Sequence, residues 1–324
     1  MIYFDVFNGD ADGICALHQL RLAQPRQSTL VTGVKRDISL LQQVSAQAGD
    51  CITVLDISLD KNRRALMNIL EQGAEVHYVD HHFAGDIPTS PHLHAHINTD
   101  ANTCTSLLVN DELKGAYLAW AVTAAFGDNL FDVAETAAKP LKLKSIEIEA
   151  LQHLGTLINY NGYGTSLADL YFPPVELYQA ITPYENPFDF IAQSPAYQTL
   201  AQGYADDMKQ AENVKIHHET SSTAILMLPD EAWTRRVSGV YGNLLARQYP
   251  NRAHALLTTL ANDTYRISVR APLNNKTGAD ELCMQFPTGG GRKAAAGINA
   301  LPSGQLDCFI QAFQQQYSYP SMNM

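Results

Sequence analysis

Carboxylate and imidazole side chains stand at the ends of several apolar segments in this 324-residue chain. They are Asp10, Asp12, Asp56, Asp80, His81, His82 and Asp128. Carboxylates that gather in one place repel one another by kilocalories unless cations neutralise them. Carboxylate together with imidazole suits Mn²⁺ or Mg²⁺, and the imidazole favours Mn²⁺. A single aspartate after a strand is usually a turn or cap residue, so the prediction of a metal site depends on these residues meeting.

Strand-like and helical segments, which must position these residues, follow one another over the first 80 residues. Short β-forming runs cover residues 2–7, 28–32, 51–55 and 74–79, and helical patterns cover residues 13–23, 39–47 and 60–72. This alternation predicts an α/β fold with a doubly wound, mainly parallel sheet. Ligands of such sheets bind beyond the carboxyl ends of the strands. The acidic segments stand at those ends, so we expect them to share one edge of the sheet.

The rest of the chain suggests a two-domain organisation. Residues 104–126 and 146–159 read as helices, and a stretch rich in proline, glycine and aromatic residues follows from 159 to 195. A second strand–helix–strand pattern begins near residue 214. We therefore expect a metal-binding domain at 1–195, a helical connector at 196–213 and a smaller α/β domain at 214–324.

Three motifs in order resemble the DHH superfamily of metal-dependent phosphoesterases. They are the Asn-Gly-Asp-Ala-Asp-Gly segment at 8–13, the Asp-His-His segment at 80–82, and a strand ending in Arg270 followed by Gly-Gly-Gly-Arg-Lys-Ala-Ala-Ala-Gly at 289–297. The first segment is similar to that of RecJ-type exonucleases, and the last to the DHH-associated C-terminal domain. In this resemblance Asn8 stands where the exonucleases carry an acid, so one ligand is lost or replaced by an amide oxygen.

The resemblance implies roles for each residue of the metal site. Asp10 and Asp56, with Asn8 as a weaker ligand, would hold a first cation. A second would be held by Asp12, Asp56, His81 and Asp128. His82 would face the scissile phosphate, and Asp80 would orient its imidazole. Two Mn²⁺ ions are expected, with Mg²⁺ as the alternative, and together they would activate a water for attack on phosphorus.

The resemblance also implies a substrate clamp in the second domain. Successive glycines let backbone N–H groups approach a phosphate closely, and arginine offers a forked donor. The expected substrate-binding residues are Arg270, Gly289, Gly290, Gly291 and Arg292. Arg292 replaces a usual histidine, which favours an anionic substrate end, although pairing with a neighbouring acid is the simpler alternative.

These expectations combine into a hydrolase that cleaves short or single-stranded oligonucleotides to mononucleotides. The alternatives are hydrolysis of a cyclic dinucleotide or of a 3′-phosphoadenosine phosphate, and a catalytically impaired module that senses a nucleotide. Expected partners are a short oligonucleotide or nucleotide, with single-stranded nucleic acid as a second class. A homodimer is compatible with the sequence, and a membrane is not expected.

Composition and charge support a globular protein that does not coat long duplexes. The chain is 46% hydrophobic and 17% charged, with a net charge of -11. The charge divides unevenly: residues 1–214 hold 12 basic and 26 acidic residues, and residues 215–324 hold 10 and 7. Five widely spaced cysteines with no CxxC pair suit reduced thiols. We expect a cytoplasmic protein.

Overall fold

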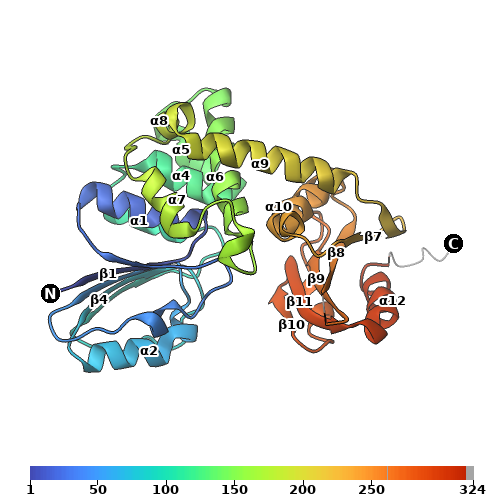
Figure 1. The fold of residues 1–324 in the computed structure, drawn as a ribbon, viewed down its shortest axis with the longest axis horizontal. Helices are drawn as coiled ribbons and strands as arrows, with labels where there is room; N and C mark the ends of the chain where they lie inside the picture. Colours follow the sequence, from blue (N-terminus) through green and yellow to red (C-terminus); the bar gives the residue numbers. More distant parts are fainter. Residues whose placement is uncertain (261, 319–324) are drawn as a thin grey trace. The chain divides into compact units, whose positions relative to one another are not determined.

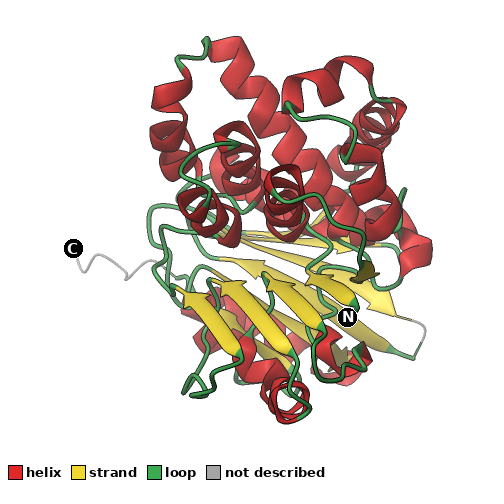
Figure 2. Ribbon diagram, turned by 90° about the vertical axis from the view of Figure 1, so that its left-hand side faces the viewer, coloured by secondary structure: helices red, strands yellow, loops and turns green. Residues whose placement is uncertain are grey.

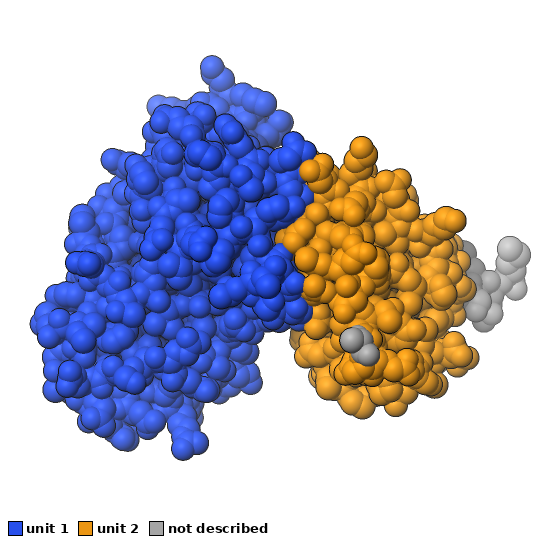
Figure 3. Space-filling model, viewed as in Figure 1, with its two compact units in different colours: residues 1–203 blue, residues 204–324 orange. Residues whose placement is uncertain are grey.

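The computed structural model describes residues 1–260 and 262–318. The chain divides into two compact units, Met1–Gly203 and Tyr204–Met324 (Figure 3). The division falls inside helix α9 (Pro195–Glu212), in the stretch for which the sequence predicts a connector. Residues 319–324 of the expected second domain lie outside the described residues. Among the helices that the structure describes, none has the length and apolar composition to cross a membrane.

The first unit is built on a five-stranded sheet in which every pairing is parallel. Its strands are β1 (Tyr3–Phe7), β2 (Thr29–Val31), β3 (Cys51–Leu55), β4 (Glu75–Asp80) and β5 (Leu93–Ile97), in the order β2-β1-β3-β4-β5. The inner strands are short apolar runs because helices cover both of their faces. Edge strand β5 is not among the strands expected from the sequence, although its Leu-His-Ala-His-Ile segment alternates apolar and polar residues as a half-buried strand does.

Helices lie on both faces of this sheet (Figures 1 and 2). One face carries α2 (Leu59–Glu71) and a 3₁₀ turn, η1 (Leu40–Gln43), which share an apolar core with the strands. The helices on the other side are α1 (Ala11–Ala23), α3 (Thr105–Glu112), α4 (Leu118–Gly127), α5 (Phe131–Ala138), α6 (Ser145–Gly162), α7 (Pro174–Ile181) and α8 (Pro187–Gln193). Helices on both faces of a parallel sheet are the doubly wound arrangement that the sequence predicts.

Three of the sequence-based element predictions are wrong in detail. The helix expected at 39–47 is only the single turn η1. The helix expected at 104–126 is two helices, because Lys114 and Gly115 adopt positive φ angles of 53° and 81° between them. The stretch at 159–195 is more regular than its turn residues suggest. Its prolines start helices α7 and α8 at their first turns, where proline is tolerated.

The second unit has a mixed six-stranded sheet in the order β10-β11-β9-β8-β7-β6. Its strands are β6 (Ile216–Glu219), β7 (Thr223–Leu228), β8 (Ala253–Leu260), β9 (Thr264–Arg270), β10 (Gly289–Arg292) and β11 (Ala295–Pro302). Only β7 and β8 pair in parallel, across the crossover helix α10 (Ala232–Gln248). Helices α11 (Ala279–Cys283) and α12 (Leu306–Gln316) complete the unit.

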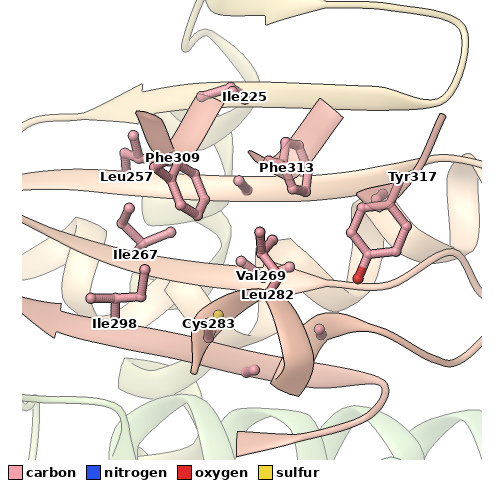
Figure 4. Close-up of a cluster of buried hydrophobic side chains, with 14 of the residues drawn as sticks. Ile225, Leu257, Ile267, Val269, Leu282, Cys283, Ile298, Phe309, Phe313 and Tyr317 are labelled. Carbon is pink, nitrogen blue, oxygen red and sulfur yellow. The ribbon is translucent and has the colours of Figure 1, made fainter. Parts of the chain in front are cut away.

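An aromatic ladder from α12 fills the core of this second unit. Phe309 and Phe313 are fully buried and stack with ring centroids 5.9 Å apart. They face the apolar side chains of the central strands, among them Leu257 and Ile267 (Figure 4). The unit thus has a hydrophobic core of its own.

Candidate metal centre

The first two acids of the candidate site lie at the start of a helix. Asp10 caps the N-terminus of α1: its Oδ1 accepts the N–H groups of Asp12 (3.0 Å) and Gly13 (3.1 Å). The sequence predicts a shared acidic site in this segment. In the structure, these two bonds at the start of the helix hold the carboxylate of Asp10 in place. A side chain at Gly13 would put its Cβ 2.2 Å from the carbonyl oxygen of Asn8, so only glycine fits this tight entry into the helix.

Asp12 is held against the N-terminus of a second helix. Its Oδ2 accepts the N–H of Thr105 and its Oδ1 accepts the N–H of Ser106, both at 2.7 Å, where α3 begins. The unpaired N–H groups at a helix start favour a negative charge. Asp12 is fully buried, so these two bonds fix its carboxylate. Nothing in the sequence spacing signals this contact, because 93 residues separate Asp12 from Thr105.

The remaining acids and histidines follow β3, β4 and α4. Asp56 comes directly after β3 in the left-handed region (φ 58°), a conformation that aspartate tolerates better than most residues. Its N–H donates to the carbonyl of Val79, which ties it to β4. His81 comes directly after β4, and Asp128 caps the C-terminus of α4. Since the strands are parallel, Asp56 and His81 emerge at the same edge of the sheet.

These side chains converge on the imidazole of His81. Its Nε2 lies 3.4 Å from Asp56 Oδ1, 3.5 Å from Asp128 Oδ2 and 3.9 Å from Asp12 Oδ2. The donor atoms of Asp12, His81 and Asp128 all lie within 4.8 Å of one another, and so do those of Asp56, His81 and His82. The structure therefore places Asp12, Asp56 and Asp128 around His81, but in two donor groups: Asp12 and Asp128 share one with His81, and Asp56 shares the other with His81 and His82.

His82 is positioned by Asp80. The Nδ1 of His82 lies 2.8 Å from Oδ1 of Asp80, which is fully buried. The same nitrogen lies 3.7 Å from Asp56 Oδ1. The side chain of His82 is 31% exposed and that of His81 is 10% exposed, so His82 is the imidazole that an incoming ligand can reach more easily.

Lys35 is a site residue that the sequence analysis misses. Its Nζ lies 2.5 Å from Asp10 Oδ2, 3.0 Å from Asn159 Oδ1 and 3.5 Å from Asp128 Oδ1. The signal that could have found it is its place shortly after β2, at the same edge as the acids. The amide of Asn8, assigned by the resemblance to a cation, donates through Nδ2 to the backbone carbonyl of Lys35.

The pKa shifts have opposite directions in two parts of the cluster: the acids around His81, and Asp10 beside Lys35. Burial, and then the charges of neighbouring aspartates, raise the pKa of Asp56 well above its ordinary value. Burial and Asp128 also raise the pKa of Asp12. Burial would raise the pKa of Asp10 too, but the Lys35 ammonium outweighs it and lowers that pKa to about 2. The pKa of Lys35 is raised in turn, because Asp10 outweighs its desolvation.

A divalent cation fits the donors around His81, either Asp12 with His81 and Asp128 or Asp56 with His81 and His82. These residues offer carboxylate oxygens and an imidazole nitrogen, the donors that Mn²⁺ and Mg²⁺ accept. Burial, and then neighbouring charges, raise the pKa values of two of the carboxylates, so a cation there would stabilise their ionised forms. Asp10 differs, since its Oδ2 already accepts a charged donor, the Lys35 ammonium, whereas the bonds to the two Asp12 oxygens come from neutral backbone N–H groups.

The residues expected to bind substrate lie in the second unit. They differ in how far contacts within that unit hold them in place. The guanidinium of Arg270 donates to Asn243 Oδ1 (2.7 Å) and to Ser268 Oγ (3.0 Å), so it is braced inside the unit. The glycine run forms edge strand β10, paired with β11. Within it, a Cβ on Gly291 would lie 2.4 Å from Ala296 Cα, so close strand packing also requires glycine. Arg292 is exposed and makes no ion pair with a residue that the structure describes.

The parallel sheet with acids and histidines at its carboxyl edge, together with a mixed-sheet unit, defines a two-unit α/β protein with a candidate metal site. No family model and no curated protein sequence matches the chain. Solved structures do. A DHH-domain protein described as a member of the s1p family of ribosomal proteins matches with 13% identity and a TM-score of 0.63, over 97% of this chain and 86% of that one.

Two other solved structures are similar over nearly the whole chain. The exonuclease RecJ bound to manganese matches with 14% identity and a TM-score of 0.62, over 98% of this chain and 90% of that one. The pGpG-specific phosphodiesterase PggH from Vibrio cholerae matches with 16% identity and a TM-score of 0.57, over 98% of both chains. The chain thus has the fold of the DHH-domain proteins, and the fold class predicted from the sequence is confirmed.

Proposed function

We propose that this protein is a metal-dependent phosphodiester hydrolase that cleaves short oligonucleotides to mononucleotides. The observation that carries the proposal is the convergence of Asp12, Asp56 and Asp128 on His81 at the carboxyl edge of the sheet. The fold supports it, because similar structures include an exonuclease bound to manganese and a pGpG-specific phosphodiesterase.

Mn²⁺ is the proposed cofactor, with Mg²⁺ as the alternative, and Asp12, Asp56, His81 and Asp128 are its proposed ligands. A bound divalent cation supplies Lewis acidity and lowers the pKa of water at the site. Asp12 is preset for this role, because two backbone N–H groups fix its carboxylate orientation before any ligand arrives.

His82 is proposed to contact the scissile phosphate. When the Nδ1–H of His82 donates a hydrogen bond to Asp80, the neutral ring keeps its Nε2 as an acceptor, and the protonated ring has a donor there as well. A donor at this position would stabilise negative charge that develops on a phosphate oxygen. Asp80 is the positioning residue in this scheme, because its buried carboxylate fixes both the tautomer and the ring orientation.

The second unit is proposed to hold the substrate through Arg270, Arg292 and the glycine strand. Arg292 is the most available of these groups, since it is exposed and Arg270 is braced by Asn243. A permanently charged group at position 292 favours a phosphorylated end. We expect Arg292→His to reduce the preference for 5′-phosphorylated over unphosphorylated dinucleotides. An unchanged preference would contradict this role.

A second candidate function is a nucleotide sensor with little catalytic power. The observation that favours it is the ion pair between Lys35 and Asp10, an expected metal ligand. Incubation with Mn²⁺ and a labelled dinucleotide, a 24-mer or a cyclic dinucleotide separates the two. The hydrolase predicts mononucleotide product from the dinucleotide, and none when EDTA replaces Mn²⁺. Product from the cyclic dinucleotide alone would indicate that the substrate is a cyclic dinucleotide and not a linear oligonucleotide. Tight binding without any product would contradict the hydrolase and support the sensor.

A further inference from the structure

We propose that the Lys35 ammonium takes the place of one divalent cation, so that the chain binds a single Mn²⁺ instead of the two that the resemblance implies. The inference rests on the proposed function, because it concerns the same cluster. It assigns the single ion to Asp12, Asp56, His81 and Asp128, and it assigns Asp10 to Lys35.

The Lys35 ammonium makes three polar contacts. Its Nζ donates to Asp10 Oδ2 (2.5 Å) and to Asn159 Oδ1 (3.0 Å), and it forms an ion pair with Asp128 Oδ1 (3.5 Å). The ring of Tyr163 adds a fourth contact, with its centroid 5.5 Å from Nζ. A positive charge is therefore already bound to Asp10, one of the ligands that the resemblance assigns to the first cation.

The backbone of Lys35 is fixed as well as its side chain. Its N–H donates to the carbonyl of Gly162 (2.9 Å), at the end of α6, and its carbonyl accepts from Nδ2 of Asn8 (3.3 Å). Asn159, which contacts the ammonium, belongs to the same helix α6. These contacts give Asn8 a role that the resemblance does not imply: its amide holds the segment that carries Lys35.

Asp10 differs from Asp12 in the positive charge that its carboxylate already faces. Its Oδ1 accepts two backbone N–H groups of α1, and its Oδ2 accepts the ammonium. A divalent ion at Oδ2 would lie next to the lysine charge, and two positive charges so close together repel strongly. Asp10 belongs to neither of the two groups of described residues that could hold a metal ion, which are Asp12 with His81 and Asp128, and Asp56 with His81 and His82.

Counting bound Mn²⁺ tests the inference without any activity measurement. Metal-free protein is dialysed against Mn²⁺, the bound metal is quantified per chain, and the electron paramagnetic resonance spectrum is recorded. We expect one Mn²⁺ per chain and the six-line spectrum of an isolated ion. Lys35→Gln frees an oxygen of Asp10 and removes the competing charge, so this variant should bind two ions and show exchange coupling, as for ions about 3.5–4 Å apart.

Lys61→Gln is the matched control, because Lys61 is an exposed lysine of the same unit, and it should keep the wild-type stoichiometry. Two coupled ions in the wild-type protein would overturn the inference, and this holds even if Lys35→Gln fails to fold. A folded Lys35→Gln variant that still binds one ion would also overturn it. No bound Mn²⁺ in the wild type would instead contradict the proposed metal-dependent function itself.

Discussion

The pair of Lys35 and Asp10 offers a quantitative test of how the acidic cluster is stabilised in the absence of metal. Asp10 is buried and Lys35 is 27% exposed, with 2.5 Å between Nζ and Oδ2. Removing one partner of a buried ion pair costs about 3–5 kcal/mol, because the other charge is left uncompensated. Because Lys35 is partly exposed, we expect this pair to lie at the lower end of that range. Lys35→Gln should therefore lower the free energy of unfolding by about 3 kcal/mol.

Asp10→Asn isolates the ion pair from the helix cap. Asparagine caps helices about as well as aspartate does, so the bonds to the start of α1 are retained while the charge is lost. We expect a loss of about 2 kcal/mol, since Lys35 keeps its contacts with Asn159 and Asp128. The double variant should lose less than the sum of the two, with a coupling energy of about 2 kcal/mol.

The assay is urea unfolding in EDTA, followed by tryptophan fluorescence. Trp120 lies buried in the first unit and Trp233 lies in the second, so a Trp233→Phe background reports on the first unit alone. Lys61→Gln serves as the exposed control and should change the stability by less than about 0.5 kcal/mol. A coupling energy for Lys35 and Asp10 as small as that of an exposed pair would refute the reasoning.

Three further predictions follow from other contacts. Asp80→Asn should lower kcat about 10–100-fold through misorientation of His82, with Mn²⁺ stoichiometry unchanged; loss of bound metal in a titration would show that Asp80 acts differently. Gly291→Ala should destabilise the second unit in thermal unfolding, because φ is 144° and the new Cβ would meet β11, whereas Gly290→Ala has open space and should unfold like wild type. Equal losses at both positions would contradict the close packing. Burial lowers the pKa of His18 from 6.5 to about 4, so the unfolded state binds more protons between these values and up to about 3 kcal/mol of stability is lost as pH falls through that window. His18→Gln should remove this part of the pH dependence in urea unfolding, and an unchanged slope would contradict it.

The sequence predicts well those parts of the site that depend on one strand and the residues just after it. Asp56 follows β3 and His81 follows β4, and in a parallel sheet these ends meet at one edge. The residues that the sequence analysis misses are brought in by tertiary contacts. Lys35 reaches Asp10 because β2 pairs with β1, and the start of α3 reaches Asp12 from more than 90 residues away.

The element predictions fail for identifiable physical reasons. Strand β5 at the edge of the sheet alternates apolar and polar residues, so a search for continuous apolar runs like that of β3 misses it. The break between α3 and α4 comes from two residues with positive φ, one of which, Lys114, has no sequence preference for that conformation. Arg270 shows that a motif residue can be assigned correctly to a strand end while its contacts within the unit stay hidden from the sequence.

The central claim is that the acids around His81 support metal-dependent cleavage of a phosphodiester bond, and one comparison tests it directly. Wild-type protein and Asp56→Asn are incubated with Mn²⁺ and a 5′-labelled dinucleotide, and mononucleotide product is followed with time. The wild type should form product steadily, and Asp56→Asn should form none above background. The circular dichroism spectrum of the variant should match that of the wild type. Wild-type rates in Asp56→Asn, or no product from the wild type, would contradict it.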